Sequence, residues 1–165
     1  MKKTFKRTMA ALLTATTIAI GMGGMSASAS TSDTNITNFT APPSVAGTYN
    51  PLPVSEKGIR VKDTDSSVYL NVTSSTYNIS VQTWGIRDTS WSSAGKNCTC
   101  NAYGSSTTAV VVSSGRRYQI KNTINEDSYA CAGLKFASTS QYNSSTVSGK
   151  WSPDYSPESG VIVAG

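Results

Sequence analysis

Residues 68–84 read VYLNVTSSTYNISVQTW, and both halves of this stretch alternate residue types with a period of two. Val68, Leu70 and Val72 would lie on one face of a strand, and the half that begins at Tyr77 repeats the pattern. Such alternation is typical of a half-buried strand. No stretch of ten residues shows a comparable apolar period of 3.6, which a surface helix would need. The stretch therefore predicts two strands of an antiparallel sheet.

Further runs of the same kind predict more strands on both sides of this stretch. The full predicted set covers residues 36–40, 58–62, 68–73, 77–84, 107–113, 118–123, 130–136 and 146–151. Turn-forming residues separate them at 63–67, 90–97, 114–115 and 125–128. From Ser30 onward 41 of 136 residues are Ser or Thr, which favours half-solvated strands over long helices. We expect an all-β fold, an antiparallel β-sandwich or small barrel of about seven or eight short strands.

The first 29 residues have the three parts of a signal peptide. A cationic start precedes an apolar stretch at residues 9–22, and Ala27-Ser28-Ala29 offers small residues to a signal peptidase. The apolar stretch is shorter than the roughly 20 residues that a membrane span requires. We therefore predict cleavage after Ala29, a secreted, extracellular protein without a membrane span, one all-β domain at 30–153 and an extended C-terminal tail at 154–165.

The charge and the composition disfavour several classes of function. The whole chain carries a net charge of +5, but four of its 14 basic residues lie in the leader, which leaves 14 − 4 = 10 against nine acidic residues. This balance does not favour a nucleic-acid partner. The chain has no histidine, the commonest general base and metal ligand. We therefore predict no catalytic residues, no bound metal and no cofactor.

Asp63 and Asp65 are the nearest approach to paired catalytic carboxylates, because alternate residues of an extended segment share a face. The same turn resembles the start of a calcium loop, but Val68 and Ser74 occupy the positions of its glycine and its bidentate acid. We interpret this turn, and the one at Asp88, as loops in which aspartate side chains cap local amides.

Cys98, Cys100 and Cys131 are the three cysteines of the chain. In an exported protein an odd count predicts one disulfide and one spare thiol. Because Cys98 and Cys100 are separated by a single residue, we expect Cys131 to pair with one of them. The alternatives are a disulfide-linked dimer through the spare cysteine, a redox pair and a three-thiolate metal site.

Trp84, Trp91 and Tyr103 lie in or beside one long loop region rich in Ser, Asn and Gly. They could form an exposed aromatic platform for a ligand. The alternative, which we favour, is that these rings serve the core and the sheet surface, as aromatic residues of small sandwiches usually do.

Four features carry a resemblance to a known family: the leader, Phe39 within an Asn/Thr-rich start, strands rich in Ser and Tyr, and the closing segment VSGKWSPD at residues 147–154. Together they resemble a family of small exported proteins of Gram-positive bacteria known only as domains of unknown function. A fainter likeness is to the lactococcin 972-type bacteriocins, which are small secreted β-sandwiches rich in Trp and Tyr. The resemblance implies export and assigns no catalytic residue.

These observations together predict a secreted, non-enzymatic protein that acts by surface contact at or near the bacterial envelope. Its expected partner is a glycan or a protein whose identity the sequence leaves open. The alternative is a secreted antagonist, either a bacteriocin-like toxin or an inhibitor of another secreted protein.

Overall fold

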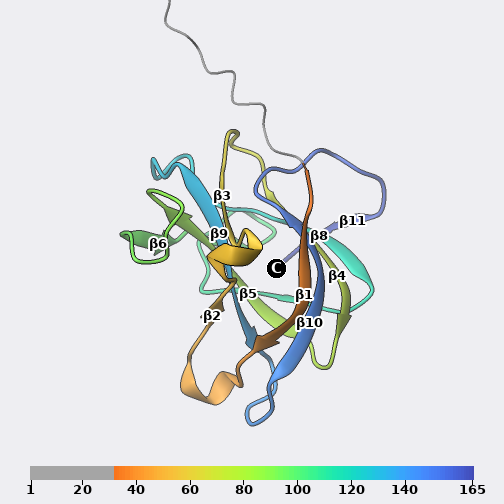
Figure 1. Cartoon of the computed structure of the whole chain (residues 1–165). Coiled ribbons are helices and arrows are strands. Elements are labelled where there is room, and N and C mark those ends of the chain that lie inside the picture. The colour runs from red at the N-terminus through yellow and green to blue at the C-terminus, as the bar shows by residue number, and fades with distance from the viewer. Residues whose placement is uncertain (1–31) are drawn as a thin grey trace, which may run out of the picture.

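The structure, a computed structural model, describes residues 32–165 (Figure 1). The predicted signal peptide, residues 1–29, and its cleavage site at Ala29 lie outside these residues. Almost all regular structure in the described part is β-strand, which confirms the predicted all-β class. None of the helical turns within residues 32–165 is long and apolar enough to cross a bilayer.

The first sheet has five strands in the order β1-β10-β4-β8-β11. Neighbouring strands are antiparallel, except that β11 runs parallel to β8. The strands are β1 (Thr34–Ala41), β4 (Val68–Ser75), β8 (Arg116–Ile120), β10 (Ser145–Ser152) and β11 (Val161–Val163).

The second sheet has six strands and is centred on the antiparallel pair β5 and β9. Both β2 and β3 pair with β9, while β6 and β7 pair with β5. The strands are β2 (Asn50–Pro51), β3 (Ile59–Val61), β5 (Ile79–Ile86), β6 (Gly95–Asn97), β7 (Val110–Val112) and β9 (Cys131–Ser138). Two single-turn 3₁₀ helices, η1 (Ser44–Ala46) and η2 (Val54–Glu56), lie in the loops that flank β2.

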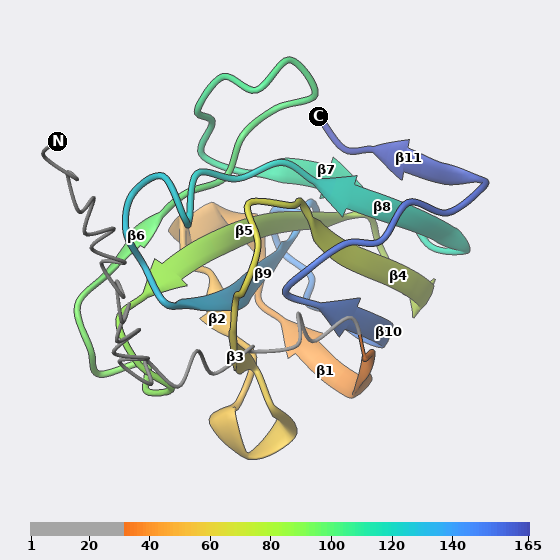
Figure 2. The ribbon, with the colours of Figure 1, turned by 90° about the horizontal axis from the view of Figure 1, so that it is seen from above.

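The two sheets pack against each other around one apolar core (Figure 2). Leu70 and Trp151 of the first sheet belong to the same buried cluster as Val81 and Leu134 of the second. The alternation in β4 is as predicted, because Val68, Leu70 and Val72 are fully buried. The strands form two separate sheets that do not close on each other, so the sandwich, and not the small barrel, is the fold.

Each of the eight predicted runs overlaps an observed strand. The structure adds β2, β6 and β11, which have only two or three residues each. β2 and β6 contain no large apolar side chain, so no row of alternating apolar residues marks them in the sequence.

The C-terminal segment differs from the prediction, because residues 154–165 are not a loose extended tail. Asp154 is buried, and Val161–Val163 forms β11 beside β8. Ala164 is also buried, and its amide donates a hydrogen bond to the carbonyl oxygen of Gln119 at 3.0 Å. The folded domain therefore continues to Ala164 instead of ending at residue 153.

Candidate functional site

A groove of about 610 Å³ lies at the end of the sandwich where β4 begins and β8 and β10 end. Eight of its twelve lining residues carry hydroxyl, amide or charged side chains, although most of the surface that the lining exposes is apolar, and Tyr155 and Cys100 are also among them. The polar lining residues include Ser66, Gln119, Lys121, Asn122 and Glu126. A concave site with several convergent polar groups is the expected form of a ligand site.

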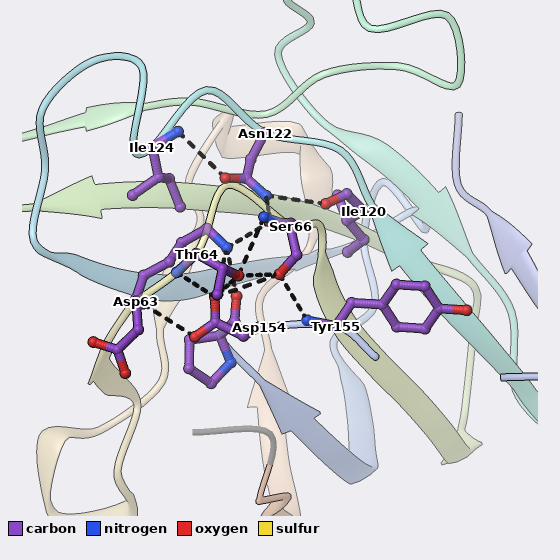
Figure 3. A network of polar contacts seen from close by, with 10 residues as sticks. Asp63, Thr64, Ser66, Ile120, Asn122, Ile124, Asp154 and Tyr155 are labelled. Carbon is purple, nitrogen blue, oxygen red and sulfur yellow. Dashed lines mark hydrogen bonds and ion pairs between the residues drawn. The ribbon is translucent and has the colours of Figure 1, made fainter. Parts of the chain in front are cut away.

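Asn122 lies just beyond the end of β8 and is one of the lining residues of the groove (Figure 3). Its side chain is buried, and its amide nitrogen donates to the carbonyl oxygens of Ile120 at 3.3 Å and Ser66 at 3.4 Å. Its side-chain oxygen accepts the amide of Ile124 at 3.3 Å. The carboxamide therefore joins β8 to the turn at residues 63–67 and holds one wall of the groove in place.

Asp154 lies behind that wall and accepts hydrogen bonds from the same turn (Figure 3). Its Oδ2 accepts the amide of Asp63 at 3.1 Å, and its Oδ1 accepts the amide of Thr64 at 3.1 Å and the hydroxyl of Thr64 at 2.6 Å. The hydroxyl of Ser66 lies 3.4 Å from Oδ1. We call these residues, with Lys62, the Asp154 network.

Lys62 completes the Asp154 network with an ion pair in which Nζ lies 3.3 Å from Oδ1. The side chain of Lys62 is 0% exposed and that of Asp154 is 2% exposed. The ammonium group also donates to the carbonyl oxygens of Pro153 at 2.8 Å and Ser66 at 2.5 Å. All three ammonium protons therefore have acceptors, as a buried charge requires.

The network keeps Asp154 ionised. Burial by itself would raise the pKa of this carboxyl group, but the hydrogen bonds from Thr64 and Asp63 and the charge of Lys62 hold it below its ordinary value. Burial lowers the pKa of Lys62, an effect that the Asp154 carboxylate opposes. The network is thus a charged clasp that joins the segment after β10 to the turn after β3.

Tyr155 follows directly and forms part of the groove wall. Its amide donates to the hydroxyl of Ser66 at 3.0 Å, and its phenol oxygen accepts the amide of Glu158 at 2.9 Å. Its ring stacks on Tyr69 with centroids 6.3 Å apart and an interplanar angle of 12°. The Asp154 network therefore holds the backbone of Tyr155, while Tyr69 and the amide of Glu158 hold its ring.

The chain was compared with protein families, with curated proteins and with solved structures. A family described as "Protein of unknown function (DUF2712)" matches residues 25–155, which include the Asp154 network and most of the groove. The chain belongs to the DUF2712 family. This match confirms one part of the predicted resemblance, which is membership of a family whose function is unknown. No curated protein and no solved structure matches the chain.

The charged residues at the rim of the groove in this DUF2712 protein are of both signs. Asp65 and Glu126 are exposed, and Lys121 is half-buried. Behind them, Asp127 accepts the hydroxyl of Thr123 at 2.7 Å and pairs with Lys96 at 2.9 Å, and these contacts lower its pKa. The rim can therefore pair with either charge on a ligand.

The two turns that contain aspartates differ in which side chain caps the backbone amides. At the second turn Asp88 accepts the amide of Ser90 at 2.8 Å and the hydroxyl of Ser93 at 2.5 Å, which confirms local capping there. At the first turn the amide of Asp63 is capped by Asp154, and Asp65 is exposed. The interpretation of local capping by Asp63 and Asp65 is therefore corrected, because the cap comes from a residue about 90 positions away.

The predicted aromatic platform is only partly assembled. Lys135 of β9 brings Trp84 and Trp91 together, since its Nζ lies 3.3 Å from the ring centroid of Trp84 and 5.2 Å from that of Trp91. Trp91 also packs on Gly133, where an added Cβ would lie 2.6 Å from the indole. A cation of the chain itself thus occupies the space between the rings.

Tyr103 does not join them, because it belongs to the loop between β6 and β7, in the turn next to the C-terminal Gly165. It is 92% exposed. Both indole N–H groups are satisfied within the fold, by Leu52 at 2.7 Å for Trp91 and by Gln82 at 2.8 Å for Trp84. The two tryptophans therefore cover the outer face of the second sheet, as the favoured alternative expected.

All three cysteines are buried free thiols, so the structure does not contain the predicted disulfide of Cys131 with Cys98 or Cys100. Cys131 lies opposite Ile86 and packs with it on the outer face of the sheet. Cys98 belongs to the core between the sheets and packs against Gly85. Adjacent residues of a strand face opposite sides, so the sheet itself separates these two thiols.

Cys100 is also buried, and it lines the groove. Burial raises the pKa of each thiol, so the three cysteines pack as small apolar side chains. A disulfide-linked dimer stays a prediction, and it would require a buried thiol to reach the surface. Within residues 32–165 no three His, Cys, Asp or Glu side chains are grouped as a metal site would need.

Sequence reasoning did not single out Asp154, Tyr155 or Asn122 as site residues. The sequence held one usable signal for Asn122. It continues the alternating row of Tyr118 and Ile120, which places its polar side chain on the buried face of the strand. A buried amide with that placement indicates a specific hydrogen-bonded role.

The titratable groups predict a flat dependence of stability on pH between about 5 and 7. Asp154 and Asp127 have lowered pKa values in the folded state, so their contribution is complete above the unfolded value near 3.9 and is lost as the pH falls below it. The buried thiols have raised pKa values, so their contribution is lost only as the pH rises above about 8.5. The pKa values of Lys62 and Lys135 are lowered from the ordinary value of 10.5. The chain has no histidine, the side chain whose ordinary pKa lies between 5 and 7. Urea midpoints measured from pH 2 to 10 should show this plateau, and a steep change between pH 5 and 7 would contradict it.

Proposed function

We propose that this protein is a secreted, non-enzymatic binding protein of the bacterial envelope, and that its groove holds a polar ligand of the glycan class. The observation that carries the proposal is the lining of the groove, in which residues with hydroxyl, amide and charged side chains occur beside one aromatic residue, Tyr155. Sugars present the matching chemistry, because their hydroxyls need hydrogen-bond partners and their C–H faces pack on aromatic rings.

The rigidity of the groove supports the proposal. Asn122 and the hydroxyl of Ser66 are already held by bonds within the fold, and the Asp154 network holds the backbone of Tyr155 beside them. A ligand that enters the groove therefore orders few side chains, which lowers the entropic cost of binding. Lys121 and Glu126 add charged donors and acceptors at the rim, and charge-assisted hydrogen bonds are the stronger kind.

Export is supported by the leader, and the proposal of a Gram-positive bacterial source rests on the resemblance of the sequence. Mass spectrometry of the protein collected from culture medium tests whether the protein is released and whether its leader is removed. We expect a chain that begins at Ser30, and recovery of the intact leader in the cell fraction alone would contradict it.

Calorimetry with soluble tetrasaccharides of glucose and of N-acetylglucosamine, and co-sedimentation with purified cell walls, test the binding function. Lys121→Ala should weaken binding about tenfold, the effect of one charged hydrogen bond. Lys150→Ala is the matched control, because Lys150 is an exposed lysine on β10 outside the groove. Absence of binding to every probe, or an equal loss in both variants, would overturn the proposal.

The second candidate is a secreted antagonist, such as a bacteriocin-like toxin or an inhibitor of another secreted protein. The observation that favours it is the combination of a small β-sandwich with a Trp- and Tyr-rich sequence, the features in which the chain is similar to lactococcin 972-type bacteriocins. Growth inhibition of related strains by the purified protein, with no retention on cell walls, would favour this candidate over the first.

A further inference from the structure

Three loops form the tip of the sandwich at the end opposite the groove, and the turn at residues 113–115, which precedes the exposed Arg116, opens toward the same end. The three loops are residues 42–49, which contain η1, residues 76–78 between β4 and β5, and residues 139–144 between β9 and β10. Figure 1 shows these loops together at the lower end of the molecule. We call them the uncharged end, because residues 41–55, 72–84 and 136–149 contain no Asp, Glu, Lys or Arg.

Backbone hydrogen bonds join the three loops into one surface. The amide of Ser44 donates to the carbonyl oxygen of Ser140 at 2.9 Å, and the amide of Thr139 donates to that of Asn78 at 2.9 Å. The amide of Val45 likewise donates to the carbonyl oxygen of Gln141 at 3.3 Å. These donors have their partners inside the protein, so they lose little when water is removed from this surface.

Large apolar side chains point outward from the same loops. Val45 is 67% exposed, Tyr142 is 79% exposed, and Tyr77 is 40% exposed. The hydrogen bonds between Ser44 and Ser140 and between Val45 and Gln141 place the first two side chains on neighbouring tips. A valine and two tyrosines therefore project from three loops that carry no charge.

We propose that the uncharged end docks on the surface of a lipid bilayer, with Val45 and Tyr142 inserted at the level of the headgroups. Tyrosine is enriched at this depth because its ring is apolar and its hydroxyl can stay hydrated. The aliphatic side chain of Val45 has nothing to offer a hydrogen-bonding glycan, whereas the acyl boundary accepts it. Because the loops carry no basic residue, the attraction does not depend on anionic lipids.

The topology then fixes the direction of the groove. β4 and β10 each run between the two ends, with residues 75 and 145 at the uncharged end and residues 68 and 152 beside the groove. A molecule docked through Val45 and Tyr142 therefore presents its groove away from the bilayer. The docking surface and the groove share no residue, so each proposal can fail without the other.

Sedimentation of sucrose-loaded vesicles tests the docking. The protein used begins at Ser30, because the strands and the core described above lie between Thr34 and Ala164, and the apolar stretch at residues 9–22 would itself enter lipid. Phosphatidylcholine vesicles and vesicles with one third phosphatidylglycerol are compared at low and high salt, beside lipid-free cell walls. The variants are Val45→Ser, Tyr142→Ser and the double variant. Tyr103→Ser is the matched control, since Tyr103 is an even more exposed tyrosine on another loop.

We expect the unchanged protein to sediment with both kinds of vesicle to the same extent at both salt concentrations. Each single substitution should lower partitioning about tenfold, as expected for one lost apolar side chain, and Tyr103→Ser should leave it unchanged. Equal thermal midpoints would show that the variants are folded. Failure to sediment, a requirement for phosphatidylglycerol, or a loss of equal size in Tyr103→Ser would overturn the proposal. Binding to lipid-free walls alone that is lost in the double variant would also overturn it and assign the surface to a glycan.

Discussion

Replacing Asp154 by asparagine should lower the free energy of unfolding by about 3–5 kcal/mol, the range for breaking a buried ion pair from one side. The substitution leaves the ammonium group of Lys62 in a site where the lysine side chain is fully buried. Every acceptor left to it would be neutral: the carbonyl oxygens of Pro153 and Ser66, and the side-chain oxygen of the asparagine. Urea denaturation at pH 7 measures the change, with the slope of the transition checked for two-state behaviour.

The complementary substitution, Lys62→Met, should cost less than Asp154→Asn. The carboxylate would still accept the amides of Asp63 and Thr64 and the hydroxyl of Thr64, so its charge would remain solvated by the protein. A double variant, Lys62→Met with Asp154→Asn, should recover part of the loss of Asp154→Asn because it removes both charges and keeps a side-chain oxygen as acceptor for the turn.

Glu158→Gln is the matched control, because Glu158 pairs with Arg117 at 2.9 Å but both side chains are more than 40% exposed. Exposed pairs contribute up to about 1 kcal/mol. If Asp154→Asn changed the stability as little as Glu158→Gln, the Asp154 network could not be the clasp that holds the groove wall. Loss of glycan retention in folded Lys62→Met would link the clasp to the proposed function.

The prediction of strands succeeded where local pattern and tertiary burial coincide. In β4 the apolar row Val68, Leu70 and Val72 is the row that faces the core, so alternation alone located the strand. The same logic failed for β11, because its three residues are held mainly by parallel pairing with β8. A parallel partner that precedes the strand by more than 40 residues leaves no trace in the local sequence.

The candidate site was less accessible to sequence reasoning for a related reason. Lys62 and Asp154 are 92 positions apart, and each lies just outside a strand. A charged side chain at such a position is usually exposed to solvent. Only the packing of two sheets brings the segments after β3 and β10 together. The composition, by contrast, constrained the chemistry directly, since a chain without histidine can use fewer general bases.

Replacing Gly149 by alanine should lower the free energy of unfolding by about 2–4 kcal/mol. This range reaches beyond the roughly 1–3 kcal/mol that overpacking usually costs. An added Cβ at Gly149 would lie 2.0 Å from the carbonyl oxygen of Asn71. That oxygen belongs to the backbone of β4 and cannot swing away as a flexible side chain would. The register of β10 also shifts here against both neighbours, next to Ser74 of β4 and Ile36 of β1. Alanine must therefore displace a strand at the centre of the first sheet.

Gly47→Ala separates this clash from the general cost of replacing a glycine. Gly47 has a φ of +59° but no atom within 4 Å of an added Cβ, so only the strain of a left-handed backbone applies, about 1 kcal/mol. Urea midpoints of the two variants should differ accordingly. Because β10 leads directly into Asp154, the Gly149 variant should also lose protection of the amides of Asp63 and Thr64 against hydrogen exchange. Equal midpoints for the two variants, or unchanged protection at those amides, would show that β4 and β10 can separate at Gly149 without disturbing the Asp154 network.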